Sequence, residues 1–343
     1  MLKTAVVILN WNGKKYLEQF LPALIKYTNS PETEIIIADN HSSDDSINFL
    51  NQNYPHIRQI IFDKNYGFTG GYNKALEQIE AEYYVLINSD IEVTKNWLNP
   101  LIELMDSNHQ IAACQPKIKA YHNKEYFEYA GASGGFIDKY GYPFCRGRML
   151  DTIEKDNGQY NDIYECFWAT GACMVVRAKL FQKFSGLDND FFAHMEEIDL
   201  CWRFKNAGYK VFVQPDSEVF HVGGGTLPSN SPFKLYLNYR NNLFLLYKNL
   251  PKRKLLPILI TRLILDGLSA IIFLLKFSFP EFNAVFKAHI HFYKSLKNLK
   301  KKRKNLQPTV LVKNHPEIFS GSIVWKYFLL KKRSFSQLKK LNR

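Results

Sequence analysis

The chain has 343 residues, 46% of them hydrophobic, and a formal net charge of +13. Its length suits one large globular domain, or a domain with an appendage, and its hydrophobic content is ordinary for a globular protein. The five scattered cysteines form no CxxC pair, which argues against a disulfide framework or a cysteine zinc site and favours a reducing compartment.

The positive charge is confined to the C-terminal third. Residues 1–231 contain 21 Lys and Arg against 29 Asp and Glu, whereas residues 232–343 contain 24 against 3. An acidic body therefore carries a strongly basic C-terminal region. Such a region binds phosphate groups, either of nucleic acid or of an anionic membrane surface.

The first 115 residues alternate between apolar runs typical of buried strands and segments with helical periodicity. Strands are predicted at residues 4–9, 34–38, 57–62, 83–87 and 111–115. The helices between them are predicted at 14–28, from a cap at Ser42 or Ser43 to about 52, at 72–80 after a flexible glycine loop at 67–71, and after a cap at Thr94.

This alternation predicts a mostly parallel sheet with right-handed crossovers. Asp39 follows the second strand and Asp90 follows the fourth. Ligands of such sheets bind beyond the carboxyl ends of the strands. We therefore expect both carboxylates to face one crevice.

Periodicity is weak from residue 121 to 164, where we expect loops and short antiparallel strands. The remaining elements of the body are predicted as a strand at 173–177, a helix at 178–184, a helix at 197–207 ended by Gly208, strands at 209–213 and 218–221, and a flexible loop at 223–225.

Residues 191–203 hold three carboxylates within four positions, namely Glu196, Glu197 and Asp199. Carboxylates this close repel each other and are costly to desolvate together. A fold tolerates them where a cation, a substrate proton or open solvent relieves the repulsion. A solvated helix start is the alternative, because acidic side chains favour a helix N-terminus.

The most apolar window is 255–275, inside a basic helical region that begins with a helix at 234–250. The window contains 14 Leu, Ile and Phe, but also Arg262, Asp266 and Pro257. On an insertion scale the apolar residues contribute roughly −4 to −8 kcal/mol and the two charges cost about 5–7 kcal/mol. This near balance favours an interfacial or re-entrant helix over a full span, with a buried bundle helix as the alternative.

Residues 300–304 are five consecutive cations. Such a run is either a solvated tail or, beside an apolar helix, an anchor to anionic lipid. The apolar window next to it favours lipid, so no nucleic-acid partner is expected.

Taken together, these motifs resemble family 2 glycosyltransferases with the GT-A nucleotide-diphospho-sugar fold, in the branch often labelled rhamnosyltransferase-like. The resemblance is carried by residues 6–13, 38–40, 65–73, 88–90 and 196–203 and by His221. It implies a Rossmann-like α/β catalytic domain over residues 1–231. Residues 232–343 are then a helical, membrane-associating extension.

The resemblance also implies a site for a nucleotide-diphosphate sugar. The residues expected to line it are Leu9, Asn10, Asn12, Asp39, Asn65, Gly70, Asn73, Asn88, Ser89, Asp90 and Arg240. Asp39 would accept a hydrogen bond from the base, or it could merely form an Asx-turn with the following residues.

Asn88, Ser89 and Asp90 stand where the family has its DxD motif. By resemblance, Asp90 and His221 would hold a divalent metal, Mn²⁺ or Mg²⁺, against the diphosphate. An imidazole ligand suits Mn²⁺ better than Mg²⁺. Asn88 replaces the first Asp and reduces the charge of the site, and a plain loop residue is the alternative for His221.

The acidic stretch matches the family's Glu-Asp-x-Asp pattern, with Glu197 in the place of the Asp. The resemblance implies that Glu197, or its neighbour Glu196, is the general base of an inverting transfer. Trp202 and Asp199 are candidates for the acceptor site. Trp202 is alternatively a core residue, and Asp199 alternatively pairs with Arg203 one turn later.

The predicted protein is an inverting glycosyltransferase, with a deoxysugar such as rhamnose from a dTDP donor as the substrate that the branch implies. Its acceptor would be a lipid-linked or cell-surface glycan at the cytoplasmic face of the inner membrane, bound peripherally or monotopically. The alternatives are a nucleotidyltransferase or dinucleotide-dependent oxidoreductase, although no GxGxxG follows the first strand. A non-catalytic, membrane-attached binding protein is a further alternative.

Overall fold

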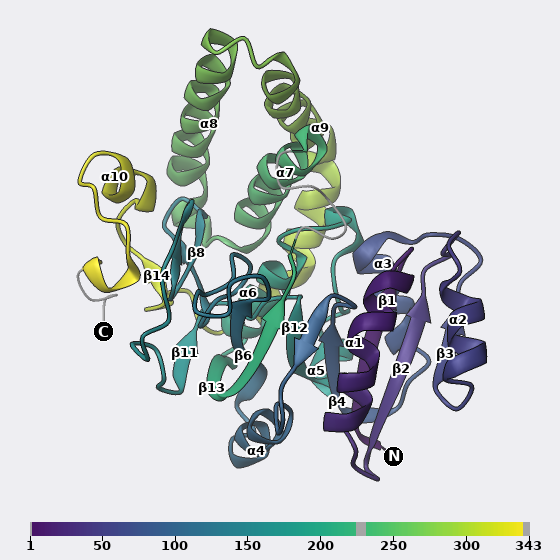
Figure 1. Cartoon of the computed structure of the whole chain (residues 1–343). Helices are drawn as coiled ribbons and strands as arrows, with labels where there is room; N and C mark the ends of the chain where they lie inside the picture. Colours follow the sequence, from purple (N-terminus) through teal and green to yellow (C-terminus); the bar gives the residue numbers. More distant parts are fainter. Residues whose placement is uncertain (1, 224–230, 339–343) are drawn as a thin grey trace.

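The computed structural model describes residues 2–223 and 231–338 (Figure 1). Its central sheet has the strand order β11-β13-β6-β12-β4-β1-β2-β3, with β5 paired to β13. The strands β1 (Leu2–Asn10), β2 (Thr33–Asp39), β3 (Arg58–Ile61) and β4 (Ala81–Ile87) are mutually parallel, as predicted. Helices α1 (Lys14–Tyr27), α2 (Ser46–Asn53) and α3 (Gly67–Leu76) connect them.

Beyond β4 the sheet is mixed. Strand β12 (Cys173–Arg177) lies antiparallel between β4 and β6 (Ile111–Ala120), and α5 (Ala178–Lys183) follows it. Strand β13 (Lys210–His221) is parallel to β6 and antiparallel to β5 (Ile91–Val93) and β11 (Tyr164–Cys166). The two strands predicted at 209–213 and 218–221 are therefore one. Its register shifts between Gln214 and Glu218, because Pro215 has no N–H to donate to the ladder.

The glycines at 67–71 are part of α3 and do not form the predicted flexible loop. They allow α3 to approach the sheet closely: a Cβ on Gly71 would lie 2.7 Å from the Leu9 side chain. The helix ends at Leu76, earlier than the predicted 80. Glycine here serves close packing of helix on strand rather than flexibility.

Two predicted helix caps are wrong. Helix α2 begins at Ser46, and Ser42 instead accepts hydrogen bonds from Asn10 Nδ2 (3.1 Å) and the Asn12 N–H (2.9 Å). Helix α4 (Asn99–Ser107) begins five residues after Thr94, whose hydroxyl donates to the Glu218 carbonyl at 2.7 Å. In both places a long-range partner takes the hydroxyl that local helix chemistry would have used.

A second sheet fills much of the irregular region and confirms the predicted antiparallel strands there. It consists of β7 (Gly135–Asp138), β8 (Pro143–Cys145), β9 (Arg148–Met149) and β10 (Thr152–Ile153). Strand β14 (Ile318–Phe319) pairs parallel to β7. The C-terminal region therefore returns to the body of the molecule, and the boundary at residue 231 stays a prediction.

The C-terminal region forms helices α7 (Pro232–Asn249), α8 (Lys252–Leu275), α9 (Phe279–Leu306) and α10 (Ile323–Phe328). Helix α7 packs against α9 and α6 (Glu196–Asn206), while α8 and the first part of α9 form a hairpin that projects from the body (Figure 1). Short 3₁₀ turns complete the described chain at η1 (Asn189–Phe191), η2 (Gln307–Thr309) and η3 (Phe335–Gln337).

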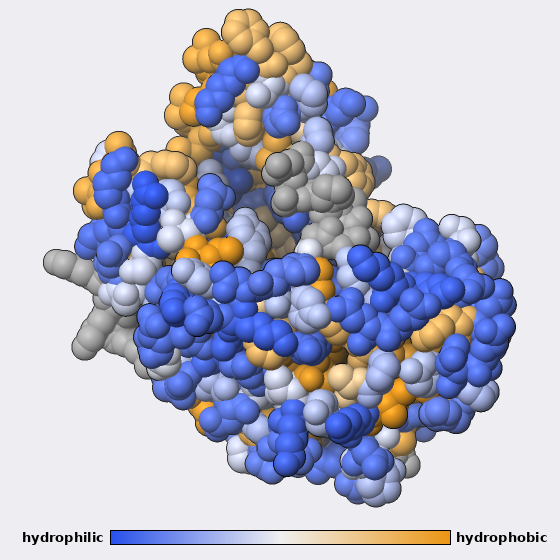
Figure 2. Space-filling model, viewed as in Figure 1, coloured by the Kyte–Doolittle hydropathy of each residue, from blue (hydrophilic) through white to orange (hydrophobic). Residues whose placement is uncertain are grey.

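Helix α8 exposes much of its apolar surface, including Ile264 (59% exposed) and Leu275 (73%). Figure 2 shows this apolar surface at the tip of the hairpin. Arg262 and Asp266, four residues apart, form an ion pair at 2.7 Å, and both are buried. Among the described residues, α8 is the one helix long and apolar enough to cross a membrane. A buried bundle helix does not describe it.

The cations at 300–304 are neither a free tail nor wholly available to lipid. They lie in the last turns of α9, where Lys302 contacts Asp188 of the body and Arg303 donates to the Tyr247 carbonyl of α7. Most of the glycine loop predicted at 223–225 lies outside the described residues.

Candidate active site

The carboxyl ends of β1 and β2 lie side by side, with Asn10 paired to Asp39 in the strand register. The Asn10 amide donates to Asp39 Oδ2 at 2.9 Å, and the Ser42 N–H donates to Asp39 Oδ1 at 2.8 Å. Asp39 therefore binds its own following backbone, but at Ser42, three residues on, rather than at the second residue as in the Asx-turn given as its alternative. Its carboxylate retains lone pairs for a further donor, so contact with a nucleotide base stays a prediction.

Asn12 and Asn65, also predicted to line the nucleotide-sugar site, hold turns together at this edge of the sheet. Asn12 Oδ1 accepts from the Ser43 N–H at 2.7 Å, which closes the β1 turn over the β2 turn. Asn65 Oδ1 accepts from the Gly67 N–H (2.7 Å) and from the Asn40 amide (3.0 Å). These contacts hold the loops rigid around the place where the donor is expected.

Two other residues predicted to line the nucleotide-sugar site, Asn73 and Arg240, bind the loop before α6. Asn73 donates to the Leu187 carbonyl at 2.7 Å and accepts from its N–H at 2.9 Å. Arg240 donates to the carbonyls of Asp190 and Phe191, each at 2.9 Å. Both side chains are occupied by the protein itself, and their contact with a donor stays a prediction, as does that of Gly70, which is buried in α3.

Asp90 and His221 come together, as the resemblance implied. Asp90 Oδ1 lies 3.2 Å from His221 Nε2, and both side chains are buried. On the other side of the imidazole, Nδ1 lies 3.4 Å from Glu128 Oε2. Burial alone would lower the pKa of His221, but the charges of Glu128 and Asp90 raise it to about 10.

Glu128 was missed by the sequence analysis. It lies in the weakly periodic region after β6, is 7% exposed, and also accepts a hydrogen bond from the Ala130 N–H. A histidine that binds a metal generally donates its second N–H to a carboxylate. Only a search for a carboxylate partner of His221 would have found Glu128, and no local pattern marks it.

Asp90 and His221 offer two possible ligands to a divalent ion, although here the imidazole is paired with Asp90 itself and would have to lose its proton to bind the ion. Adjacent ligands of an octahedral ion with bonds of about 2.1 Å lie about 3 Å apart, close to the 3.2 Å between Asp90 Oδ1 and His221 Nε2. The chain residues that the structure describes contain no cluster of three or more His, Cys, Asp or Glu with metal-binding geometry. An ion at Asp90 and His221 would thus need the diphosphate and water as further ligands.

The acid pair occupies the first turn of α6 and is largely removed from solvent, so the alternative of a solvated helix start does not hold. Glu196 is 4% exposed and Glu197 is half-buried. One carboxylate oxygen of each is buried without a hydrogen-bond partner among the described residues. Desolvation raises the pKa of Glu197 to about 7, and desolvation with repulsion from Glu197 raises the pKa of Glu196 well above its usual range.

The segment between β11 and β12 lies between Glu197 of the acid pair and the turn at Asn88 that follows β4. The Ala172 carbonyl accepts from the Asn88 N–H at 2.9 Å, and a Cβ built on Gly171 would lie 3.8 Å from Glu197 Cβ. Ser89 in turn lies against Gly13, after β1. The turn after β1, the turn after β4 and the start of α6 are therefore neighbours in the structure, and their sharing one site stays a prediction.

Both acceptor-site candidates are core residues. Trp202 is 1% exposed and packs edge-on against Phe167, with ring centroids 5.2 Å apart. Asp199 is fully buried and pairs with Arg203 at 2.9 Å, which is the role given as the alternative to an acceptor contact. Neither side chain lines a surface that an acceptor could reach in this structure.

Residues 5–184, more than half of the chain, match the family described as "Glycosyl transferase family 2". The chain belongs to this family. It is thus a glycosyltransferase, and the GT-A fold expected from the resemblance is confirmed by solved relatives.

Two sequence relatives are rhamnosyltransferases. The N-acetylglucosaminyl-diphospho-decaprenol L-rhamnosyltransferase of Mycobacterium tuberculosis is 24% identical over 231 residues, covering 63% of this chain and 75% of the relative. Rhamnosyltransferase WbbL of Escherichia coli K12 is 23% identical over 229 residues, covering 63% and 82%. The rhamnosyltransferase-like placement of the glycosyltransferase is therefore confirmed.

Among solved structures, GalNAc-T7 with UDP, GalNAc and Mn²⁺ matches with a TM-score of 0.56 and 16% identity. The match covers 72% of this chain and 48% of GalNAc-T7, so the glycosyltransferase spans about half of that relative's length. At this identity the likeness concerns the fold.

Proposed function

We propose that this glycosyltransferase moves a sugar, with rhamnose as the first candidate, from a nucleotide diphosphate to a hydroxyl of a lipid-linked or cell-surface glycan, with inversion. The named activities of the two bacterial relatives support the sugar and the acceptor class. The observation that carries the proposal is the buried acid pair beside the segment that binds Asn88.

Glu197, rather than Glu196, is the general base. Glu196 is buried to 4% exposure, whereas Glu197 is half-buried and can meet an acceptor. A base whose pKa is about 7 is well matched to proton transfer near neutral pH. Glu197 takes the proton of the acceptor hydroxyl while the hydroxyl oxygen forms a bond to the anomeric carbon of the sugar. The bond from that carbon to the diphosphate breaks, and the nucleoside diphosphate leaves with the electron pair.

Asp90 and His221 would hold a divalent cation, with Glu128 orienting the imidazole. When bound, the cation would neutralise charge on the departing diphosphate. The solved structure of GalNAc-T7 with Mn²⁺ supports this ion class. Asp39, Asn10 and Asn12 hold the turns that would enclose the nucleotide.

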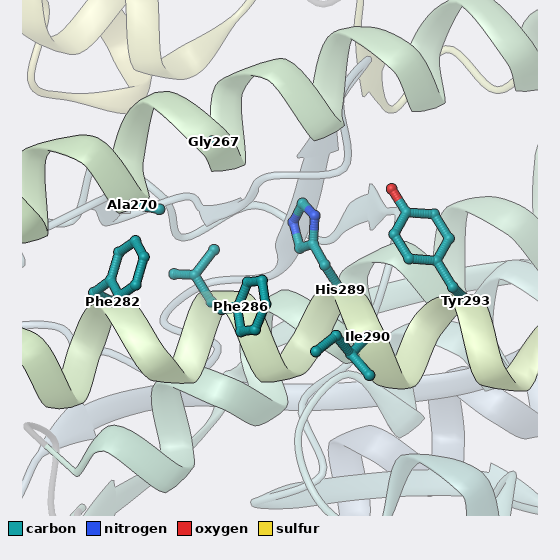
Figure 3. A pocket seen from close by; sticks show the side chains of 8 residues that line it. Gly267, Ala270, Phe282, Phe286, His289, Ile290 and Tyr293 are labelled. Atoms are coloured by element: carbon teal, nitrogen blue, oxygen red, sulfur yellow. The ribbon is translucent and has the colours of Figure 1, made fainter.

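The hairpin of α8 and α9 is the proposed membrane contact, at the cytoplasmic face of the inner membrane. Its apolar side chains are exposed, and the region around it carries most of the positive charge of the chain. A groove of about 260 Å³ opens between the two helices, and in Figure 3 the side chains of α9 point into it from below Gly267 and Ala270. Its lining residues are Gly267, Ala270, Phe282, Val285, Phe286, His289, Ile290 and Tyr293.

The function is tested by incubating purified protein with a panel of nucleotide-sugars, with and without MnCl₂, and measuring release of nucleoside diphosphate. We expect turnover of a dTDP-deoxysugar that depends on the metal and is lost in Glu197→Gln. Absence of turnover with every donor, at full occupancy of nucleotide, would reject the proposed activity.

The membrane contact needs a separate test, because deletion of residues 232–343 would also remove α7, which packs on the catalytic body. We expect Ile264→Glu with Leu268→Glu to abolish sedimentation with phosphatidylglycerol vesicles. Unchanged sedimentation would exclude α8 from the contact.

A further inference from the structure

The loop that leads into the acid pair is fastened by the C-terminal helices. Asp188 accepts hydrogen bonds from Lys248 of α7 and Lys302 of α9. Lys302 also pairs with Asp190 at 2.6 Å, and Asn298 donates to the same carboxylate at 2.6 Å. One lysine of α9 therefore bridges two carboxylates of this loop.

Helix α7 binds the backbone of the same loop. The Asn241 amide donates to the carbonyls of Phe191 (3.0 Å), Ala193 (2.8 Å) and His194 (2.7 Å). Asn241 is fully buried, and its own oxygen accepts from Arg240 Nε at 2.9 Å. The two N–H bonds of this one amide are thus shared among three backbone carbonyls just before α6, of which the Phe191 carbonyl also accepts from Arg240.

The loop needs this support because its backbone is strained. Phe192, His194 and Met195 have φ angles of 65°, 69° and 70°, in the left-handed region that side-chain-bearing residues avoid. Such conformations persist where surrounding contacts over-determine them, and they cluster at functional sites. Met195 is the residue from which α6 begins, so its conformation sets the direction of Glu196 and Glu197.

The same fastening continues one turn into α6. Lys248 contacts Asp199 at 2.9 Å as well as Asp188, and the Asn249 amide donates to Asp199 at 2.8 Å. The buried charges are balanced: burial would raise the pKa of Asp188, but Lys248 and Lys302 hold it below its usual range. The loop and the first turns of α6 are therefore clamped on both sides of the acid pair.

We propose that Asn241, Lys248 and Lys302 are positioning residues that hold the loop at 188–195 so that Glu197 faces the acceptor. The inference rests on the proposed function for its catalytic meaning. The C-terminal region is then part of the catalytic machinery, in addition to any membrane contact. Lys302 lies on the same helix as the apolar groove, so the membrane hairpin and the loop before the base share α9.

The test compares Lys302→Met with Lys302→Arg and with Lys297→Met, which removes the same charge from an exposed position of α9. Turnover is measured with the donor that the wild-type enzyme hydrolyses, and backbone hydrogen exchange is followed over residues 190–198. We expect Lys302→Met to lower kcat about tenfold with the donor KM within twofold, since small misplacement of a reacting group costs rate. Exchange in the loop should rise, Lys302→Arg should restore both, and Lys297→Met should change neither.

Asn241→Asp should disturb the loop more than Lys302→Met does, because the carboxylate keeps the shape of the amide but cannot donate to the three carbonyls. We expect about a 100-fold loss of kcat with nucleotide affinity retained in calorimetry. Unchanged kcat and unchanged loop exchange in both Lys302→Met and Asn241→Asp would overturn the inference. Faster loop exchange in these variants of a protein that turns over no donor would instead reject the proposed function and leave the clamp standing.

Discussion

The edge of the sheet has two sides that differ in how their polar groups are used. On the Asp39 side, the side chains of Asn10, Asn12 and Asn40 bind neighbouring turns and tie them together. On the side of α6, Glu196 and Glu197 each keep a buried oxygen without a hydrogen-bond partner among residues 2–223 and 231–338. Asn10 Oδ1 on the first side is also buried without a partner in these residues. The two sides therefore differ in the number of hydrogen bonds that tie turns together and in charge, because the unpaired oxygens beside α6 belong to carboxyl groups.

This difference matches the two tasks of a transferase site. A sugar donor that must be oriented needs pre-organised turns, and the hydrogen bonds between the β1 and β2 turns supply that order. A proton acceptor needs a carboxylate whose pKa lies near neutrality, and burial with an unpaired oxygen supplies that. The backbone strain before α6 is held by the contacts from α7 and α9, so the reactive side depends on distant helices.

The largest expected effect is the loss of transfer when the proposed base on the α6 side is replaced. Glu197→Gln should lower transfer by about 10²–10⁴-fold, the usual contribution of a positioned base, while binding of the nucleotide stays within twofold. Steady-state kinetics and calorimetry measure the two. Glu103→Gln, an exposed carboxylate of α4, is the matched control. Transfer near the wild-type rate in Glu197→Gln would move the base elsewhere.

The next effect concerns the group that supports the metal site without being a ligand itself. Glu128→Gln should weaken Mn²⁺ binding by about 10–100-fold, because partners behind a ligating histidine orient it and raise its basicity. Titration of Mn²⁺ by calorimetry in the presence of dTDP checks this without any turnover. Equal Mn²⁺ affinity in wild type and variant would mean that His221 does not bind the ion.

The rigid side was largely predictable from the sequence, since its strands are apolar runs buried on both faces and its functional residues end them. Asp39 and Asp90 could be assigned to one edge from chain order alone. The errors there came from tertiary contacts: the glycines of α3 pack against Leu9, and Thr94 bonds a strand carbonyl rather than capping a helix.

The reactive side was predictable only in part. The acid pair was evident, but Glu128 meets His221 from a region without periodicity, and no local pattern indicates such a contact. The basic composition of the C-terminal region indicated lipid, whereas Lys248 and Lys302 are used against the carboxylates of the loop at 188–195. A charge count cannot separate a cation that faces solvent from one that faces a buried acid.

A smaller change tests the rigid side. Asp39→Asn keeps the size of the side chain but removes the charge that would receive the base N–H, and it should weaken nucleotide binding about tenfold, consistent with the loss of a hydrogen bond to a charged group. Calorimetry with dTDP measures the loss, and kcat should stay within twofold. A fall in kcat without a fall in affinity would mean that Asp39 acts in the chemical step, and the division between the two sides would fail.

The smallest expected effect is on stability, and its sign is opposite to that on activity. Burial raises the pKa of Glu197 from 4.5 to about 7, so the folded state favours its protonated form. That contribution is fully present below pH 4.5 and is lost as the pH rises through about 7. At pH 8 the folded wild type carries an ionised, poorly solvated carboxylate, which Glu197→Gln removes. Discounted for partial exposure and for coupling to Glu196, the gain in unfolding free energy should be roughly 1 kcal/mol at pH 8 and vanish near pH 4.5. Urea unfolding at both pH values measures it, and a variant less stable than wild type at pH 8 would show that the acid is paired rather than held in reserve.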